Sequence, residues 1–171
     1  MVKMTNFHEE QRFRQVWLWI IIPGGSTLMI VLAVLGILEQ VINDRQWGTN
    51  PISDTWLVVS SGLMVIGALL LVYGFIKLRL IISVTDQRIF IRLWPFPGKT
   101  IVPAEIRNAQ AITFSPLKDH GGWGIRFFEG GRAYTVSGNH GVEMELISGK
   151  KLIVGSRLAD ELALAIKALC K

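Results

Sequence analysis

The sequence predicts an α+β membrane protein, in which a transmembrane helical hairpin precedes a small antiparallel β-barrel or sandwich closed by a C-terminal helix. Three observations lead to this fold class. Two uncharged apolar runs occupy residues 16–38 and 56–76. Short alternating apolar segments separated by turn residues follow them. The end of the chain, residues 157–171, then has the apolar spacing of a helix.

Each apolar run is long enough to cross a bilayer. The hydrocarbon core is about 30 Å thick and a helix rises about 1.5 Å per residue, so roughly 20 apolar residues suffice. A core helix of a soluble protein would carry a polar stripe, and neither run has one. The first run is also too long for a cleaved signal peptide and lacks a small-residue cleavage site. We therefore expect transmembrane helices at residues 16–38 and 56–76, joined by an extracytoplasmic loop at residues 39–55.

The charged residues around the two runs predict their orientation. The basic residues that flank the hairpin lie on one side of it: Lys3, Arg12, Arg14, Lys77 and Arg79. The loop at residues 39–55 has one arginine against three acidic residues. Because basic segments stay on the cytoplasmic side, we expect both the N-terminal segment, residues 1–15, and the domain at residues 79–171 to be cytoplasmic.

Small residues predict how the helices pack. Ser60, Gly67 and Gly74 recur every seven residues in the second run, and Ser26 and Ala33 repeat this spacing in the first. Small side chains let two helix backbones approach closely. We therefore expect these faces to be in contact.

Pro23 interrupts the first run together with the glycine, serine and threonine residues that follow it. Proline removes one backbone donor, so we expect a kink there. A hinge or substrate pathway is one interpretation, and a kinked packing surface is the other. The absence of charged residues from both runs favours the packing surface.

Residues 79–171 have the pattern of a soluble β-domain. Turn residues such as Thr85-Asp86-Gln87 separate short strand-like segments. These segments are residues 79–85, 88–94, 99–102, 109–114, 123–128, 132–137, 141–147 and 150–155. The closing helix is expected to bury one apolar side, formed by Leu158, Leu162, Ile166 and Leu169.

On the segment at residues 88–94, arginine and aromatic residues alternate with aliphatic ones. Because successive strand side chains point to opposite faces, Arg88, Phe90, Arg92 and Trp94 are expected to share one face. Such a face suits contact with a protein or a membrane, and burial under a neighbouring element is the alternative. The predicted partner or membrane interface consists of these four residues with Lys77 and Arg79.

The charge balance and the missing motifs limit the function. From Lys77 onward the chain has 14 Lys or Arg against 8 Asp or Glu, hence +6. A basic domain beside an anionic leaflet is attracted to it, although an ordinary solvated surface has similar charge. The three histidines and Cys170 lack the spacing of a metal site or disulfide framework, and no catalytic constellation or nucleic-acid motif is visible. We expect no enzyme, no cofactor, no metal and no nucleic-acid partner.

Four segments follow the hairpin in order: LIISVTDQRIFIR at residues 80–92, IVPAEI at 101–106, GGWGIR at 121–126 and KLIVGS at 151–156. With these segments and its element lengths, the chain resembles the bacterial pleckstrin-homology-like domain proteins in which a two-helix hairpin precedes the domain. The resemblance implies a binding or assembly module and a PH-like fold.

The expected function is therefore that of a binding or scaffold protein anchored in the bacterial inner membrane. Its PH-like domain would mediate protein assembly or contact with the anionic bilayer. The expected partners are the lipid bilayer and an unidentified membrane or cytoplasmic protein. A homo-oligomeric pore or transport-associated subunit is the alternative.

Overall fold

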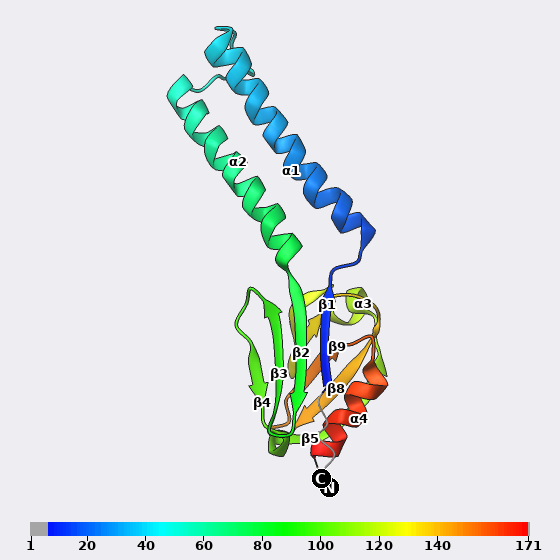
Figure 1. The fold of residues 1–171 in the computed structure, drawn as a ribbon. Coiled ribbons are helices and arrows are strands. Elements are labelled where there is room, and N and C mark those ends of the chain that lie inside the picture. Colours follow the sequence, from blue (N-terminus) through cyan, green and yellow to red (C-terminus); the bar gives the residue numbers. More distant parts are fainter. Residues whose placement is uncertain (1–6, 171) are drawn as a thin grey trace. The chain divides into compact units, whose positions relative to one another are not determined.

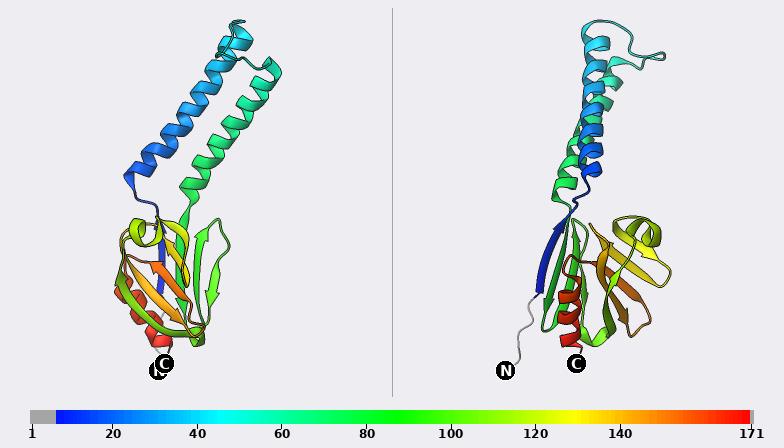
Figure 2. Two further views of the ribbon diagram at one scale, coloured as in Figure 1. Left: turned by 180° about the vertical axis from the view of Figure 1, so that it is seen from behind. Right: turned by 90° about the vertical axis from the view of Figure 1, so that its right-hand side faces the viewer.

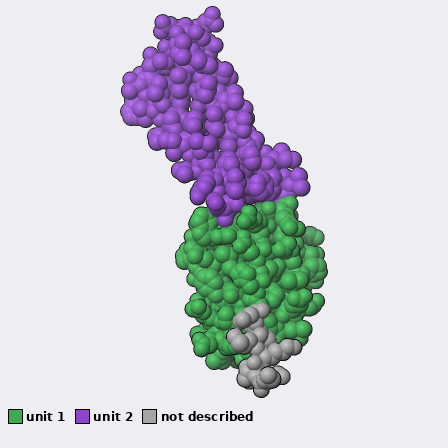
Figure 3. All heavy atoms as spheres, in the orientation of Figure 1, with its two compact units in different colours: residues 1–14, 78–171 green, residues 15–77 purple. Residues whose placement is uncertain are grey.

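The structure is a computed structural model that describes residues 7–170. It divides into two compact units (Figure 3). Residues 15–77 form a helical unit, and the chain on both sides of them, residues 1–14 and 78–171, forms a β-domain. The predicted α+β fold class is confirmed, because a pair of apolar helices is followed by two β-sheets and a C-terminal helix (Figure 1).

The helical unit contains α1 (Val16–Ile37) and α2 (Asp54–Lys77), and a π-helical turn, η1 (Leu38–Ile42), extends α1 beyond its predicted end. By length and composition, the spans Val16–Ile42 and Asp54–Lys77 are each long and apolar enough to cross a membrane. Large side chains such as Leu28 and Leu63 are 59% and 67% exposed. Water contact with apolar surface costs about 25 cal/mol per Å², so this surface suits a lipid environment.

Helices α1 and α2 lie side by side and contact each other through small residues. In α1, Ser26 and Ala33 are buried, as the spacing of seven predicts. In α2 the buried small residues are Ser61 and Ala68. The contact face of α2 is therefore shifted by one position from the predicted face. Ser60 and Gly67 are exposed, and a Cβ added at Gly74 would meet no atom within 4 Å.

An aromatic contact lies on the same face of α2 as these buried small residues. Continuing the spacing of seven from Ser61 and Ala68 leads to Phe75. The Phe75 ring meets the Trp19 ring edge-on, with centroids 5.0 Å apart. Large edge-to-face contacts of this kind stabilise the arrangement that forms them. Pro23 lies inside α1, which the structure assigns as helical without interruption from Val16 to Ile37.

The β-domain consists of two sheets that form separate layers (Figure 2). The first sheet has the order β1-β2-β3-β4, with β1 (Phe7–Arg12), β2 (Arg79–Thr85), β3 (Arg88–Trp94) and β4 (Lys99–Ile101). The second has the order β5-β8-β9-β7-β6, with β5 (Ile106–Thr113), β6 (Gly124–Phe128), β7 (Gly131–Thr135), β8 (His140–Leu146) and β9 (Lys151–Gly155). Two short helical turns, η2 (Pro103–Glu105) and α3 (Pro116–His120), lie in the connections.

Two features of this topology were not predicted. Strand β1 belongs to the segment expected only as a cytoplasmic N-terminus, and it pairs antiparallel with β2 from Phe7 opposite Val84 to Arg12 opposite Arg79. Strands β7 and β9 pair in parallel, whereas a purely antiparallel succession was expected. The β-domain is therefore discontinuous in sequence, with the helical hairpin inserted between its first two strands.

Helix α4 (Ala159–Leu169) packs against β5 and β8. Leu162 and Ile166 are buried, as predicted, and Leu169 is partly buried. Leu158 is 44% exposed, because it precedes the first helical residue and has a non-helical backbone. Leu158 therefore does not belong to the buried side of the helix, contrary to the prediction.

Two buried polar residues fasten β1 to the start of α4. Glu9 accepts hydrogen bonds from the Ser156 hydroxyl at 2.5 Å and from the Arg157 backbone N–H at 3.1 Å. Gln11 donates to the Gly155 carbonyl at 2.8 Å. Hydrogen bonds offset the cost of burying polar groups, so these bonds help a charged strand lie against the core, although Gln11 Oε1 is buried without a partner among the described residues.

Candidate functional site

The predicted interface on β3 has the expected register. Ile89, Ile91 and Leu93 are buried, and the residues between them are exposed or half-buried. Arg88, Phe90, Arg92 and Trp94 therefore share the outer face of the first sheet. Arg79 lies opposite Trp94 on β2 and shares this face.

Several of these residues already have partners within the domain. Arg79 Nη1 lies 3.2 Å from both carboxylate oxygens of Glu10. This hydrogen bond and the charges of Arg79 and Arg12 lower the pKa of Glu10, although partial burial opposes the shift. Arg92 donates from Nε to the Phe96 carbonyl at 3.2 Å. Much of the cationic potential of this face is therefore used internally.

The other predicted interface residues also differ in setting. A Cβ on Gly98 would lie 2.6 Å from the Phe90 ring, so this ring is closely covered by the loop before β4. Lys77 ends α2 in the helical unit, with its ammonium 5.8 Å from the centre of the Tyr73 ring. Arg88 is exposed. A partner-binding role for this face stays a prediction.

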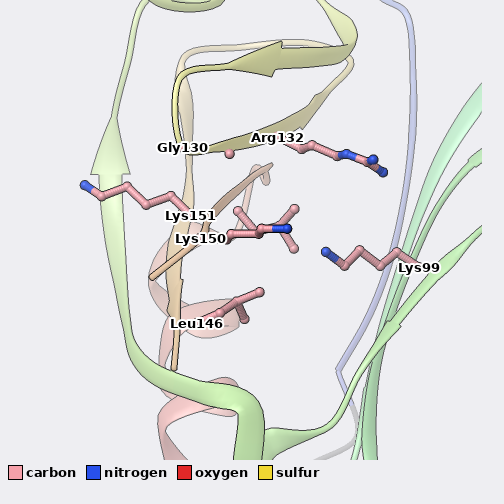
Figure 4. Close-up of a pocket in the computed structure, with 8 residues that line it drawn as sticks. Lys99, Gly130, Arg132, Leu146, Lys150 and Lys151 are labelled. Atoms are coloured by element: carbon pink, nitrogen blue, oxygen red, sulfur yellow. The ribbon is translucent and has the colours of Figure 1, made fainter. Parts of the chain in front are cut away.

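The structure also forms a cationic cavity, which we call the basic pocket. Its volume is about 390 Å³, and its lining residues are Lys99, Gly130, Gly131, Arg132, Leu146, Lys150, Lys151 and Leu152. Figure 4 shows the Lys99, Arg132 and Lys150 side chains extending toward one shared space. The Lys151 side chain points away, toward Glu143, whose carboxylate it contacts at 3.5 Å.

Strand alternation explains why these cations meet. Lys99 lies opposite Ile91 and two positions before Ile101, so it is on the core-facing side of edge strand β4. Arg132 lies opposite the buried Leu152 and is therefore on the core-facing side of β7. Lys150 is in the turn that leads into β9. Two core-facing cations from different sheets and one turn cation thus converge at the open edge of the sandwich.

The charges in the pocket are only partly offset by a carboxylate, that of Glu105. The side chains of Lys99 and Lys150 make no hydrogen bond or ion pair with any residue in the described range 7–170. Partial burial lowers the pKa of the Lys99 ammonium, and the Arg132 and Lys150 cations lower it further, whereas Glu105 has the opposite effect. An anionic group placed in the pocket would relieve this repulsion.

The sequence analysis counted these three cations only as part of the net charge. A usable signal was present, because Lys99 alternates in phase with the apolar Ile101, and Arg132 with Tyr134 and Val136. A cation in phase with a strand's core residues marks a charge held at the sandwich edge. Bringing Lys150 into the group required the sheet topology.

Among residues 7–170, apart from the His120 side chain, no group of three or more His, Cys, Asp or Glu side chains is placed to hold a metal ion. No protein-family model matches the chain, and no curated protein matches it in sequence. Fold and site together define a helical hairpin that carries a two-sheet α+β domain with a cationic pocket.

Proposed function

We propose that the protein is a binding protein anchored in the bacterial inner membrane, whose β-domain binds a phosphate-type anionic group in the basic pocket. The observation that carries this proposal is the convergence of Lys99, Arg132 and Lys150 on one cavity, where no carboxylate of the described residues forms an ion pair with any of the three. Ammonium and guanidinium groups bind phosphate oxygens through short, charge-assisted hydrogen bonds. A cavity of about 390 Å³ also lies in the size range of small-molecule sites.

Electrostatics makes anion binding favourable here. Two unit charges 4 Å apart interact by about 4 kcal/mol at the effective dielectric typical of a protein surface. In the free domain, partial burial and then the neighbouring cations lower the pKa of the Lys99 ammonium. A bound phosphate would oppose the repulsion between the cations and favour the charged form of the lysine.

The topology of the β-domain supports the proposed orientation. Strands β1 and β2 pair along their whole length, and the two apolar helices lie between them in sequence. Paired strands must be on the same side of a membrane, so the helices must cross it an even number of times. Two crossings satisfy this condition. The basic residues at both ends of the hairpin favour the cytoplasmic side.

The proposal can be tested with the full chain in a neutral detergent. Glycerol phosphate, as a soluble anion, and phosphatidylglycerol in mixed micelles, as a lipid, would be titrated separately while the thermal unfolding midpoint is followed. We expect at least one probe to raise the midpoint, with an effect that weakens as salt is added. The double variant Lys99→Gln/Lys150→Gln should lose the shift.

A matched control uses the exposed lysines outside the pocket, in Lys118→Gln/Lys167→Gln, which removes the same charge. This control should keep the shift. Equal loss in both double variants would show that net charge alone attracts the probe, and no shift with either probe in the unsubstituted protein would contradict anion binding.

A further inference from the structure

A second cavity, which we call the aromatic cleft, lies beside the basic pocket in the β-domain. Its volume is about 550 Å³, and it is mainly apolar. The lining residues that matter here are Phe13, Leu78, Phe96, Trp123, Phe127 and Arg132. Phe127 is 71% exposed and Phe96 is 50% exposed. Large aromatic side chains on a cavity wall favour binding of an apolar group.

Arg132 connects the two cavities, because it lines both of them. Its guanidinium carbon lies 4.6 Å from the centre of the Phe127 ring. Phe127 and Arg132 are directly opposite each other on β6 and β7. A ligand with an anionic end and an apolar end could therefore place one end in each cavity, with Arg132 in contact with both.

Trp123 lines the cleft and has an indole N–H that is unpaired within residues 7–170. Its indole Nε1 is shielded from solvent and has no hydrogen-bond partner among the described residues. A buried donor without an acceptor costs about 1–3 kcal/mol.

The chain holds the cleft close to the ends of the apolar helices. Phe13 precedes the start of α1 at Val16 by three residues, and Leu78 follows Lys77, the last residue of α2. An extended chain spans at most about 3.6 Å per residue, so Phe13 cannot be more than about 11 Å from Val16 along the chain. Membrane lipid is therefore within reach of this wall of the cleft.

We propose that the aromatic cleft holds an acyl chain of an anionic phospholipid from the surrounding bilayer, while the phosphate of that lipid occupies the basic pocket beside Arg132. The headgroup half of this inference rests on the proposed function. The acyl-chain half rests on the size and apolar lining of the cleft and on Arg132, which lines both cavities.

The test uses the full chain in lipid nanodiscs of phosphatidylcholine with a small fraction of a phosphatidylglycerol that has a photoreactive diazirine at the end of one acyl chain. After irradiation, labelled peptides are identified by mass spectrometry. We expect adducts on residues 123–128, in addition to those on the helices. The variant Phe96→Gln/Phe127→Gln should reduce labelling of this segment about tenfold, as for a loss of about 1.4 kcal/mol in affinity.

The control variant Leu117→Gln/Leu164→Gln changes two leucines that are 63% and 68% exposed but lie outside the cleft. It should keep the labelling of residues 123–128. If only the helices are labelled in the unsubstituted protein, or if the control loses as much labelling as the cleft variant, the acyl chain does not occupy the cleft.

A phosphatidylcholine with the same photoreactive chain separates the two proposals. Preferential labelling by the phosphatidylglycerol probe, abolished in Lys99→Gln/Lys150→Gln, supports the headgroup site. Equal labelling of the cleft by both probes would refute the anionic headgroup site but retain the acyl-chain site. Stabilisation by glycerol phosphate without any labelling of the cleft would support the anionic site but refute the acyl-chain site.

Discussion

Replacing Glu9 with alanine tests how the N-terminal strand is fastened to the β-domain. The Glu9 side chain is 5% exposed, and its carboxylate is the acceptor for the Ser156 hydroxyl and the Arg157 backbone N–H. Its ion pair with the Arg157 guanidinium, at 3.5 Å, has a smaller weight because the arginine side chain is 47% exposed. The variant would leave two donors without their acceptor.

The expected cost is about 3 kcal/mol. Hydrogen bonds to a charged group contribute about 1.5–3 kcal/mol each, and the value for the partly buried Arg157 N–H is at the low end of this range. Glu9→Gln keeps one carbonyl acceptor, so about 1 kcal/mol is expected for this milder change. Because 1.4 kcal/mol corresponds to a factor of ten, Glu9→Ala should raise the opening equilibrium of β1 about a hundredfold.

Hydrogen–deuterium exchange of the full chain in mild detergent would measure this effect directly. Backbone amides of Phe7–Arg12 should exchange faster in Glu9→Ala. Glu10→Ala is the matched control, since this neighbouring residue points to the outer face and pairs with an Arg79 side chain that is 39% exposed. Its expected effect is below about 1 kcal/mol. Equal acceleration in the two variants would refute the proposed fastening.

Ala68→Leu should lower the stability of the hairpin in detergent by about 1–3 kcal/mol, because Ala68 is buried. Gly67→Leu should be tolerated, because a Cβ at Gly67 would meet no atom within 4 Å. A larger loss of stability in Gly67→Leu than in Ala68→Leu would contradict this packing. Since the pKa of Glu10 is lowered mainly by Arg79, the stabilising contribution of Glu10 is present at neutral pH and is lost as the pH falls below about 4.5 through the lowered value. Arg79→Gln should therefore weaken the acid dependence of unfolding, and an unchanged pH profile would exclude this pair as its source. A reporter active only outside the cytoplasm should be active near Asn50 and silent after the C-terminus, and the opposite pattern would reject the orientation.

The local sequence pattern was sufficient for most elements but not for β1. Strands β2 and β3 have their predicted bounds, because strict alternation on both sides of a polar turn defines a hairpin locally. Strand β1, with the sequence FHEEQR, places Glu9 and Gln11 on its inner face, where an apolar pattern would be needed to recognise it. Glu9 and Gln11 can be buried because residues 155–157, far away in the sequence, supply their hydrogen-bond partners. For the same reason, a fragment of residues 79–171 lacks one strand of the domain.

The candidate sites were less accessible to sequence reasoning than the fold. The alternating face of β3 is a local property and has the expected register. The basic pocket instead depends on the distance between β4 and β7, which belong to different sheets. The packing face of α2 includes the contact of Phe75 with Trp19, a contact between helices that the spacing of seven alone does not determine.

The insertion of the helical hairpin between β1 and β2 has a consequence for the order of folding. Strand β1 is synthesised first, but the 66 residues 13–78 separate Arg12 from its partner Arg79. Closing a flexible loop of that length costs about 3.7 kcal/mol from the logarithmic length term alone. Antiparallel association of α1 and α2 returns the chain toward its starting point and removes most of this entropy cost. In the proposed membrane-anchored protein, packing of α1 against α2 would therefore come before pairing of β1 with β2.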